Sequence, residues 1–245
     1  MNREEILKSL ESYNDQNFKF DPINHKYTYE DNHFISVTQF ISKFHKPFDT
    51  EYWSNYKAKE RGISKEEILK EWKEKNDRAN FIGTSTHDWI EFYFNGEFKK
   101  LPTDKDVVDR INKFNHLYAD HLHKLEPVCF ERKIFSKKWK IAGMIDSIFL
   151  YKDKVIIIDY KTNKEFITDE TIKYKEYLLP PFDHLYKTHL NEYSIQISMY
   201  MMILKEIGIN VSAGYLLYIG PNDSKIYRSL DLVTIIEEYL TKQNI

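Results

Sequence analysis

Two aspartates in one predicted β-hairpin have the residue type and the spacing of a metal site. Apolar runs at 144–151 and 155–158 flank a short polar turn, and the β-branched residues of the second run favour strands over a helix. With a two-residue turn, Asp146 falls opposite Asp159 on one face of the sheet, with Cβ atoms ~5 Å apart. Facing carboxylates repel each other unless a cation lies between them. Because hard ions prefer oxygen ligands, the hairpin predicts a site for Mg²⁺ or Mn²⁺.

Lys161 completes this predicted group. It follows Asp159 by two residues, one strand period, so its ammonium points toward the same position. The alternative is that all three are solvated residues at strand ends, because charged side chains are mostly exposed. A three-residue turn would also shift the register by one residue and separate the carboxylates. The hairpin alone leaves both interpretations open.

Two predicted helices could bring further polar side chains to the hairpin. A helix that follows Gly83 places His87 beside an apolar face. A second helix, over 191–207, places Gln196 and Tyr200 one turn apart on the same face. Each also has a structural interpretation: a hydrogen-bonded core histidine in the first helix, and a Gln–Tyr contact in the second.

The remaining elements predict a mixed sheet with helices packed on it. Gly83 is expected to interrupt the helical pattern that begins at Ser64, and nearly thirty residues after the hairpin, 165–193, show no period. A long irregular segment in a compact domain is usually functional or disordered, and here it is interpreted as a substrate-contacting flap. We expect the other helices at 2–13, from Ser36 or Thr38, at 103–125 and at 232–240, and the other strands in 18–35 (one or two), 127–135, 211–219 and 225–230.

Composition narrows the classes of function. The 245 residues are 42% hydrophobic and 30% charged, which is typical of a globular chain with a full core. A net charge of −2 argues against a protein that coats duplex DNA non-specifically. A local basic patch around Trp139 is a candidate nucleic-acid contact, and a solvated β-turn is an equal alternative; its residues are Arg132, Lys133, Lys137, Lys138 and Lys140.

The single cysteine and the apolar runs exclude other classes. Cys129 alone allows no intramolecular disulfide, no four-cysteine zinc site and no iron–sulfur cluster. Because the sequence shows neither an apolar run of about 18 residues nor an apolar segment near its start, we expect no membrane partner and a cytoplasmic location, the host cytoplasm if a phage encodes the chain.

Four short motifs, taken in order, resemble those of a known family. Gly83-x-x-x-His87, Gly143-x-x-Asp146, Asp159-Tyr160-Lys161-Thr162 and Gln196-x-x-x-Tyr200 resemble the motifs of the RecB-like branch of the PD-(D/E)XK nuclease superfamily. The resemblance implies a restriction-endonuclease-like α/β core, a mixed central sheet flanked by helices, over about 81–230. A helical N-terminal elaboration over 1–80 would complete a single domain, 1–245. Ile145 stands where the family has proline.

The resemblance also implies roles for the motif residues. Asp146 and Asp159 would hold the metal with the Tyr160 carbonyl, and His87 would complete its shell. Lys161 would orient or deprotonate the attacking water, so that Lys161, Asp146 and Asp159 form the catalytic group. In addition, Gln196 and Tyr200 would position the nucleic-acid strand, with Glu91 assisting from the next turn of its helix.

The sequence therefore predicts a metal-dependent deoxyribonuclease. Its nearer likeness is to phage-type or recombination exonucleases without an iron–sulfur cluster, acting on single-stranded DNA or duplex ends in recombination, repair or replication. A catalytically inactive nucleic-acid-binding module of the same fold is the main alternative, and a small-molecule phosphohydrolase is a third. Cleavage polarity, exo or endo mode, DNA or RNA preference and oligomeric state are left open by the sequence.

Overall fold

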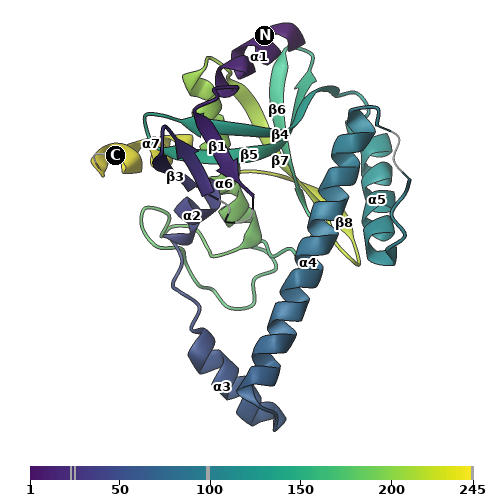
Figure 1. Ribbon diagram of the computed structural model, residues 1–245, viewed down its shortest axis with the longest axis vertical. Helices are drawn as coiled ribbons and strands as arrows, with labels where there is room; N and C mark the ends of the chain where they lie inside the picture. Colours follow the sequence, from purple (N-terminus) through teal and green to yellow (C-terminus); the bar gives the residue numbers. More distant parts are fainter. Residues whose placement is uncertain (23, 25, 98–99, 244–245) are drawn as a thin grey trace.

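A mixed eight-stranded sheet with helices on both faces forms the centre of the protein (Figure 1). The structure is a computed structural model that describes residues 1–22, 24, 26–97 and 100–243. This architecture confirms the predicted fold class. The strands are β1 (Phe18–Asp21), β2 (Lys26–Tyr29), β3 (Asn32–Ser36), β4 (Glu126–Ser136), β5 (Ile141–Tyr151), β6 (Lys154–Lys161), β7 (Val211–Ile219) and β8 (Ser224–Arg228).

The helices divide between the two faces of the sheet. On one face α6 packs against α2 and α7, and on the other α5 packs against α4. Capping boxes start α1, α2 and α4, formed by Asn2 with Glu5, Ser36 with Gln39 and Ser64 with Glu67. The bounds are α1 (Arg3–Leu10), α2 (Val37–Ser42), α3 (Thr50–Arg61), α4 (Lys65–Phe94), α5 (Lys105–Leu117), α6 (His189–Glu206) and α7 (Val233–Lys242), with a 3₁₀ turn at Glu11–Tyr13 and a π-helical turn at Tyr118–Leu122.

Strand β6 is apolar because both of its faces are covered. Val155 and Ile157 belong to the core cluster under α6, whereas Ile156 and Ile158 belong to the cluster under α4 and α5. A strand that is buried on both faces has a continuous apolar run rather than an alternating one. The same alternation points the Asp159 and Lys161 side chains toward the α6 face, and the Tyr160 ring toward the α4 face.

The predicted hairpin register is correct. Strands β5 and β6 pair from Tyr151 with Lys154 to Ser147 with Ile158, which requires the two-residue turn. Lys152, rather than Asp153, takes the positive φ in that turn, at 59°. Asp146 and Asp159 are the next positions along this register, just beyond the last paired residues.

Strand β5 is shared by three neighbours, and this opens a fork in the sheet. Its whole length pairs with β4 along one edge. On the opposite edge β3 pairs with Ile141 and Ala142, and β6 begins to pair only at Ser147. Residues 143–146 therefore lie between two diverging strands, where Met144 and Asp146 are partly exposed and Ile145 is buried in the core.

Two predictions about the N-terminal third are wrong. Helix α4 is 30 residues long and continues through Gly83. The glycine lies where the helix approaches the end of β6, and an added Cβ would lie 3.3 Å from the Thr162 hydroxyl oxygen. The segment 18–36 forms three strands, not one or two, and they extend the main sheet through the β3–β5 pairing. The N-terminal elaboration is therefore part strand as well as helical.

A helical arm projects from the body (Figure 1). It consists of α3 and the part of α4 that precedes Gly83, which pack together as a hairpin of helices. The segment 162–188 holds no helix or long strand and passes between the arm and the body, with one isolated bridge between Tyr177 and Tyr186. Among the described residues, none of the helices combines the length and the apolar character needed to cross a membrane.

Candidate functional site

Asp146 lies in the fork of the sheet and is held there by the neighbouring strand. Its Oδ2 accepts a hydrogen bond of 2.7 Å from the backbone N–H of Tyr160. This bond replaces the next rung of the β5–β6 ladder, which ends at Ser147 and Ile158. The Asp146 side chain is only 12% exposed, so its carboxylate faces the inside of the fork rather than bulk solvent.

Three potential metal ligands from three elements meet at this point. His87 on α4, Glu131 on β4 and Asp146 on β5 each offer one ligand atom, and these atoms all lie within 4.8 Å of one another. The His87 Nδ1 is 3.6 Å from both Glu131 Oε1 and Asp146 Oδ2. The other ring nitrogen, Nε2, lies 3.1 Å from the Tyr160 carbonyl oxygen. His87 and Asp146 therefore meet at Nδ1 of the imidazole together with Glu131, whereas the Tyr160 carbonyl contacts the other ring nitrogen.

Glu131 is a candidate ligand that was not predicted. The β4–β5 register pairs Phe130 with Ser147 and Arg132 with Ile145, so Glu131 lies directly across from Asp146. It adopts φ 45°, a left-handed conformation that is uncommon for a non-glycine residue. The facing carboxylates of this site are thus contributed by β4 and β5, in addition to Asp159 on β6. Glu91 is not a member of the three-residue group.

Asp159 forms the second half of the site with Lys161. The Asp159 side chain is 1% exposed, and its Oδ2 lies 2.5 Å from the Lys161 ammonium. The same ammonium donates to Gln196 Oε1 at 3.0 Å and lies 4.2 Å from the centre of the Tyr193 ring. The predicted lysine is therefore held between β6 and α6.

Gln196 and Tyr200 form a buried hydrogen bond one turn apart on α6. The Gln196 amide nitrogen donates to the Tyr200 hydroxyl at 2.9 Å, while its carbonyl oxygen accepts from Lys161. Gln196 is 8% exposed and Tyr200 is 3% exposed. The structural Gln–Tyr contact that the sequence left open is present, and Gln196 also contacts Lys161 of the predicted catalytic group.

Neighbouring carboxylates raise the pKa values of His87 and Lys161, whereas burial acts to lower them. Burial alone would lower the pKa of the His87 imidazole, but Asp146 and Glu131 outweigh it and raise that pKa to about 9. Burial likewise acts to lower the pKa of Lys161, and Asp159, Tyr193 and Asp146 together hold it above its ordinary value. Both groups therefore carry a proton at neutral pH in the metal-free protein. Burial raises the pKa values of Asp146 and Asp159.

The donor set fits a hard divalent cation. Carboxylate and carbonyl oxygens with one imidazole suit Mg²⁺ or Mn²⁺ better than softer metals. Both Asp159 carboxylate oxygens are buried; Oδ2 lies against the Lys161 ammonium, whereas Oδ1 has no hydrogen-bond partner among the described residues, an unusual state for a charged group. Three carboxylates, those of Glu131, Asp146 and Asp159, surround one fork, and a bound cation would offset their mutual repulsion.

A cavity of about 600 Å³ opens next to these groups, so the site is accessible to a ligand. It lies between α4 and the end of β6, and its lining includes His87, Glu131 and Lys161. A smaller cavity of about 220 Å³ fills the fork itself beside Gly143 and Tyr200, and Met144 lines both cavities.

Several residues of the predicted basic patch make contacts within the protein. Trp139 is 4% exposed and belongs to the core, with the Lys138 ammonium 4.0 Å from the centre of its ring. Arg132 donates to the Leu10 carbonyl oxygen and to Asn14, and Lys137 pairs with Asp15. The contacts of Arg132 and Lys137 join the β4–β5 hairpin to the N-terminal segment, so these two residues are not simply part of a solvated turn.

Comparisons with known proteins give no family for the chain and two distant structural likenesses. No protein-family model and no curated protein sequence matches the chain. Among solved structures, it is similar to a protein crystallised as SSO0001, at 15% identity and a TM-score of 0.33, over 100% of this chain and 87% of that one. It is also similar to a protein from Eubacterium rectale described as a candidate exonuclease, at 11% identity and a TM-score of 0.43, over 68% of this chain and 64% of that one. Because both TM-scores lie below 0.5, neither likeness decides the function.

Proposed function

We propose that the protein is a divalent-metal-dependent nuclease that hydrolyses phosphodiester bonds of DNA, as a RecB-like member of the PD-(D/E)XK superfamily and an exonuclease. The observation that carries the proposal is the meeting of His87, Glu131 and Asp146 within 4.8 Å, beside the ion pair of Asp159 and Lys161. Asp146, Asp159 and Lys161 are the residues of the family motif, and they lie together in the fork in the predicted register.

The ligands of the metal would be His87, Glu131 and Asp146, with Asp159 and the Tyr160 carbonyl at the same fork. A divalent cation there would supply positive charge to a phosphodiester under attack. His87 must lose its proton before it can coordinate, because a metal binds neutral imidazole, so metal binding should release protons. The role of the surrounding carboxylates is to hold that charge in a site that is largely shielded from water.

Lys161 would act on the attacking water. Its ammonium donates to Asp159 and Gln196, and its pKa lies above the ordinary value, so in the metal-free protein it donates hydrogen bonds and does not accept them. This supports orientation of the water, and stabilisation of negative charge at the phosphate, over deprotonation. Gln196 and Tyr200 would position the lysine as well as the strand.

The proposal is tested by cleavage of an end-labelled single-stranded DNA, with and without Mn²⁺. Asp146→Asn and Glu131→Gln should each abolish or strongly reduce cleavage, because each removes a ligand charge at nearly constant side-chain volume. Glu126→Gln is the matched control, since Glu126 is an exposed glutamate on the same strand β4. The ladder of products would also show whether cleavage proceeds from an end.

Other outcomes separate the alternative functions. Strand binding without cleavage in Mg²⁺ or Mn²⁺ would indicate an inactive binding module, and cleavage of a nitrophenyl phosphate in preference to DNA would indicate a small-molecule phosphohydrolase. Full DNA cleavage in excess EDTA would contradict a metal-dependent mechanism. Mn²⁺ should also raise the melting temperature of the wild-type protein but not that of Asp146→Asn, because only a ligand that binds the native state stabilises it.

A further inference from the structure

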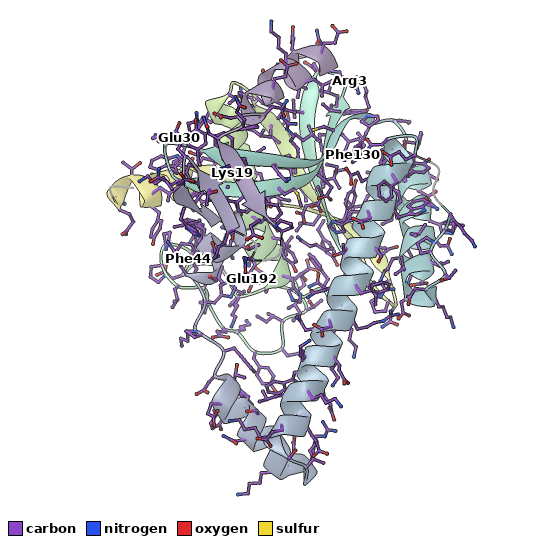
Figure 2. All side chains as sticks on the ribbon, in the orientation of Figure 1. Arg3, Lys19, Glu30, Phe44, Phe130 and Glu192 are labelled. Atoms are coloured by element: carbon purple, nitrogen blue, oxygen red, sulfur yellow. The ribbon has the colours of Figure 1, made fainter. Side chains whose placement is uncertain are left out.

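A second large cavity lies on the far side of Gln196 from the predicted metal ligands. It has a volume of about 610 Å³ and is bounded by the linker between α2 and α3, by Lys187 and by α6. We call it the linker pocket. Figure 2 labels Glu192, one of its lining residues, on α6 at the edge of the body that faces the arm.

The linker pocket adjoins the candidate active site through the contacts of Lys161. Tyr193 and Gln196 line it, and both contact Lys161: the ammonium lies 4.2 Å from the Tyr193 ring centre and donates to Gln196 at 3.0 Å. Lys161 also lines the cavity beside His87 on the other side. A polymer that crosses the site would therefore occupy one cavity on each side of the lysine.

Two features of the lining suit a nucleotide. The lining carries two lysines, Lys46 and Lys187, and one carboxylate, that of Glu192, which lies 3.5 Å from His45; the Lys187 ammonium also lies 3.3 Å from Glu176, which is outside the lining. Phe48 is 64% exposed, and its ring is held edge to face against Trp72 of the arm, with centroids 5.9 Å apart. An exposed ring in a fixed orientation offers a stacking surface to a base, and neighbouring lysines offer charge to its phosphates.

We infer that the linker pocket binds the nucleotides of a single strand that adjoin the reacting phosphodiester, with Phe48 stacking on a base and Lys46 and Lys187 facing phosphates. This inference rests on the proposed function. A pocket of this size admits individual nucleotides rather than a double helix, and a stacking ring requires an unpaired base. The substrate class is therefore single-stranded DNA, either free or at a frayed end.

The test measures binding in EDTA, so that it does not depend on cleavage. Fluorescence anisotropy of a labelled oligothymidylate gives the Kd of the wild-type protein and its variants at several salt concentrations. Phe48→Leu, which keeps an apolar contact with Trp72, should raise the Kd about 5- to 100-fold with an unchanged salt dependence, the range expected for one lost base stack. Lys46→Ala and Lys187→Ala should each reduce the slope of log K against log salt by about 0.7.

Matched controls come from the β5–β6 turn. Tyr151 is also an exposed aromatic, 40% exposed, and the Lys152 ammonium lies 5.6 Å from its ring centre. Tyr151→Leu and Lys152→Ala should leave both Kd and salt slope unchanged. Equal losses in the control and pocket variants, or tighter binding of a blunt duplex than of the single strand, would overturn the inference.

Further outcomes separate the pocket from the proposed function and from a protein partner. If the wild-type protein binds the strand through the pocket but cleaves nothing with Mn²⁺, the proposed function fails and the pocket stands. If it cleaves DNA while the pocket variants bind as the wild type does, the pocket inference alone fails. Loss of a dimer in Phe48→Leu by sedimentation, with unchanged strand binding, would assign the ring to contact with a second copy and overturn the inference.

Discussion

Replacing Gln196 by alanine should destabilise the protein and slow cleavage together, because one buried amide serves two groups. The substitution leaves the Tyr200 hydroxyl, in a side chain that is 3% exposed, without its donor. A buried polar group that loses its partner costs ~1–3 kcal/mol. At about 2–4 °C per kcal/mol for a chain of this length, the melting temperature should fall by ~2–12 °C.

Cleavage should fall as well, because Lys161 loses one of its two hydrogen-bonding partners. Asp159 still holds the ammonium at 2.5 Å, so the loss of turnover should be smaller than the ~10²–10⁴-fold expected when the lysine itself is removed. Metal binding should persist, since Gln196 is not among the candidate ligands. A raised Kd for the oligonucleotide, with normal turnover at saturation, would indicate instead that Gln196 contacts the strand directly.

A double-mutant cycle with Tyr200→Phe isolates the buried pair. With the hydroxyl gone, Gln196→Ala no longer leaves an unpaired oxygen, so the double variant should be more stable than the sum of the single effects predicts, by ~0.5–3 kcal/mol. Urea unfolding of the four proteins measures this coupling. Additive effects, or a Gln196→Ala protein that unfolds as the wild type does, would refute the hydrogen bond as a source of stability.

Three further predictions concern neighbouring residues. Lys161→Ala should keep Mn²⁺ binding in calorimetry while turnover falls ~10²–10⁴-fold, and loss of binding would contradict its role. Gly143→Ala should cost ~1–3 kcal/mol by urea unfolding, because its Cβ would lie 2.7 Å from a Tyr200 ring carbon and 3.1 Å from a Val37 methyl; an unchanged stability would show that the fork can expand. Burial raises the pKa of Glu192 to about 7, next to His45 and Lys187, so the folded state binds its proton more tightly and stability falls as pH rises from about 5 to 7. Glu192→Gln should therefore be more stable than the wild type over that range, by at most ~3 kcal/mol, and solvent screening should reduce this gain. Parallel profiles of stability against pH for the two proteins would count against the shift in the pKa of Glu192.

The parts of the site that could be predicted from sequence are set by local periodicity. The apolar runs of β5 and β6, with a two-residue turn between them, predict that Asp146 lies opposite Asp159. The strand period places Lys161 on the same face of the sheet as Asp159. The helical period likewise placed Gln196 one turn from Tyr200. These relations depend on residues within one hairpin or one helix.

The residues that were missed depend on pairing between more distant segments. Glu131 reaches Asp146 only through the β4–β5 register, which in turn depends on the turn after Ser136. Applying the hairpin argument to the preceding strand was the available signal. The prediction that Gly83 interrupts the helix was wrong because a glycine lowers helix stability only slightly. Its place in the helix is explained by a tertiary contact, the close approach to Thr162. The linker pocket joins two segments far apart in the sequence, 38–48 and 187–196, and no period predicts it.

The burial of β6 raises the question of what fixes its register. Since Val155 to Ile158 are apolar on both faces, a one-residue slip would exchange one buried apolar face for another, and hydrophobic burial specifies the pairing only weakly. Two polar contacts at the end of the ladder do distinguish the registers. The Ser147 hydroxyl donates to the Ile158 carbonyl at 2.7 Å, and Asp146 accepts from the Tyr160 N–H. A slip would separate both pairs and leave buried polar groups unpaired. Asp146 therefore helps to hold the strand that carries Asp159 and Lys161 in register, so the residue that is a candidate metal ligand also aligns the other two members of the predicted catalytic group.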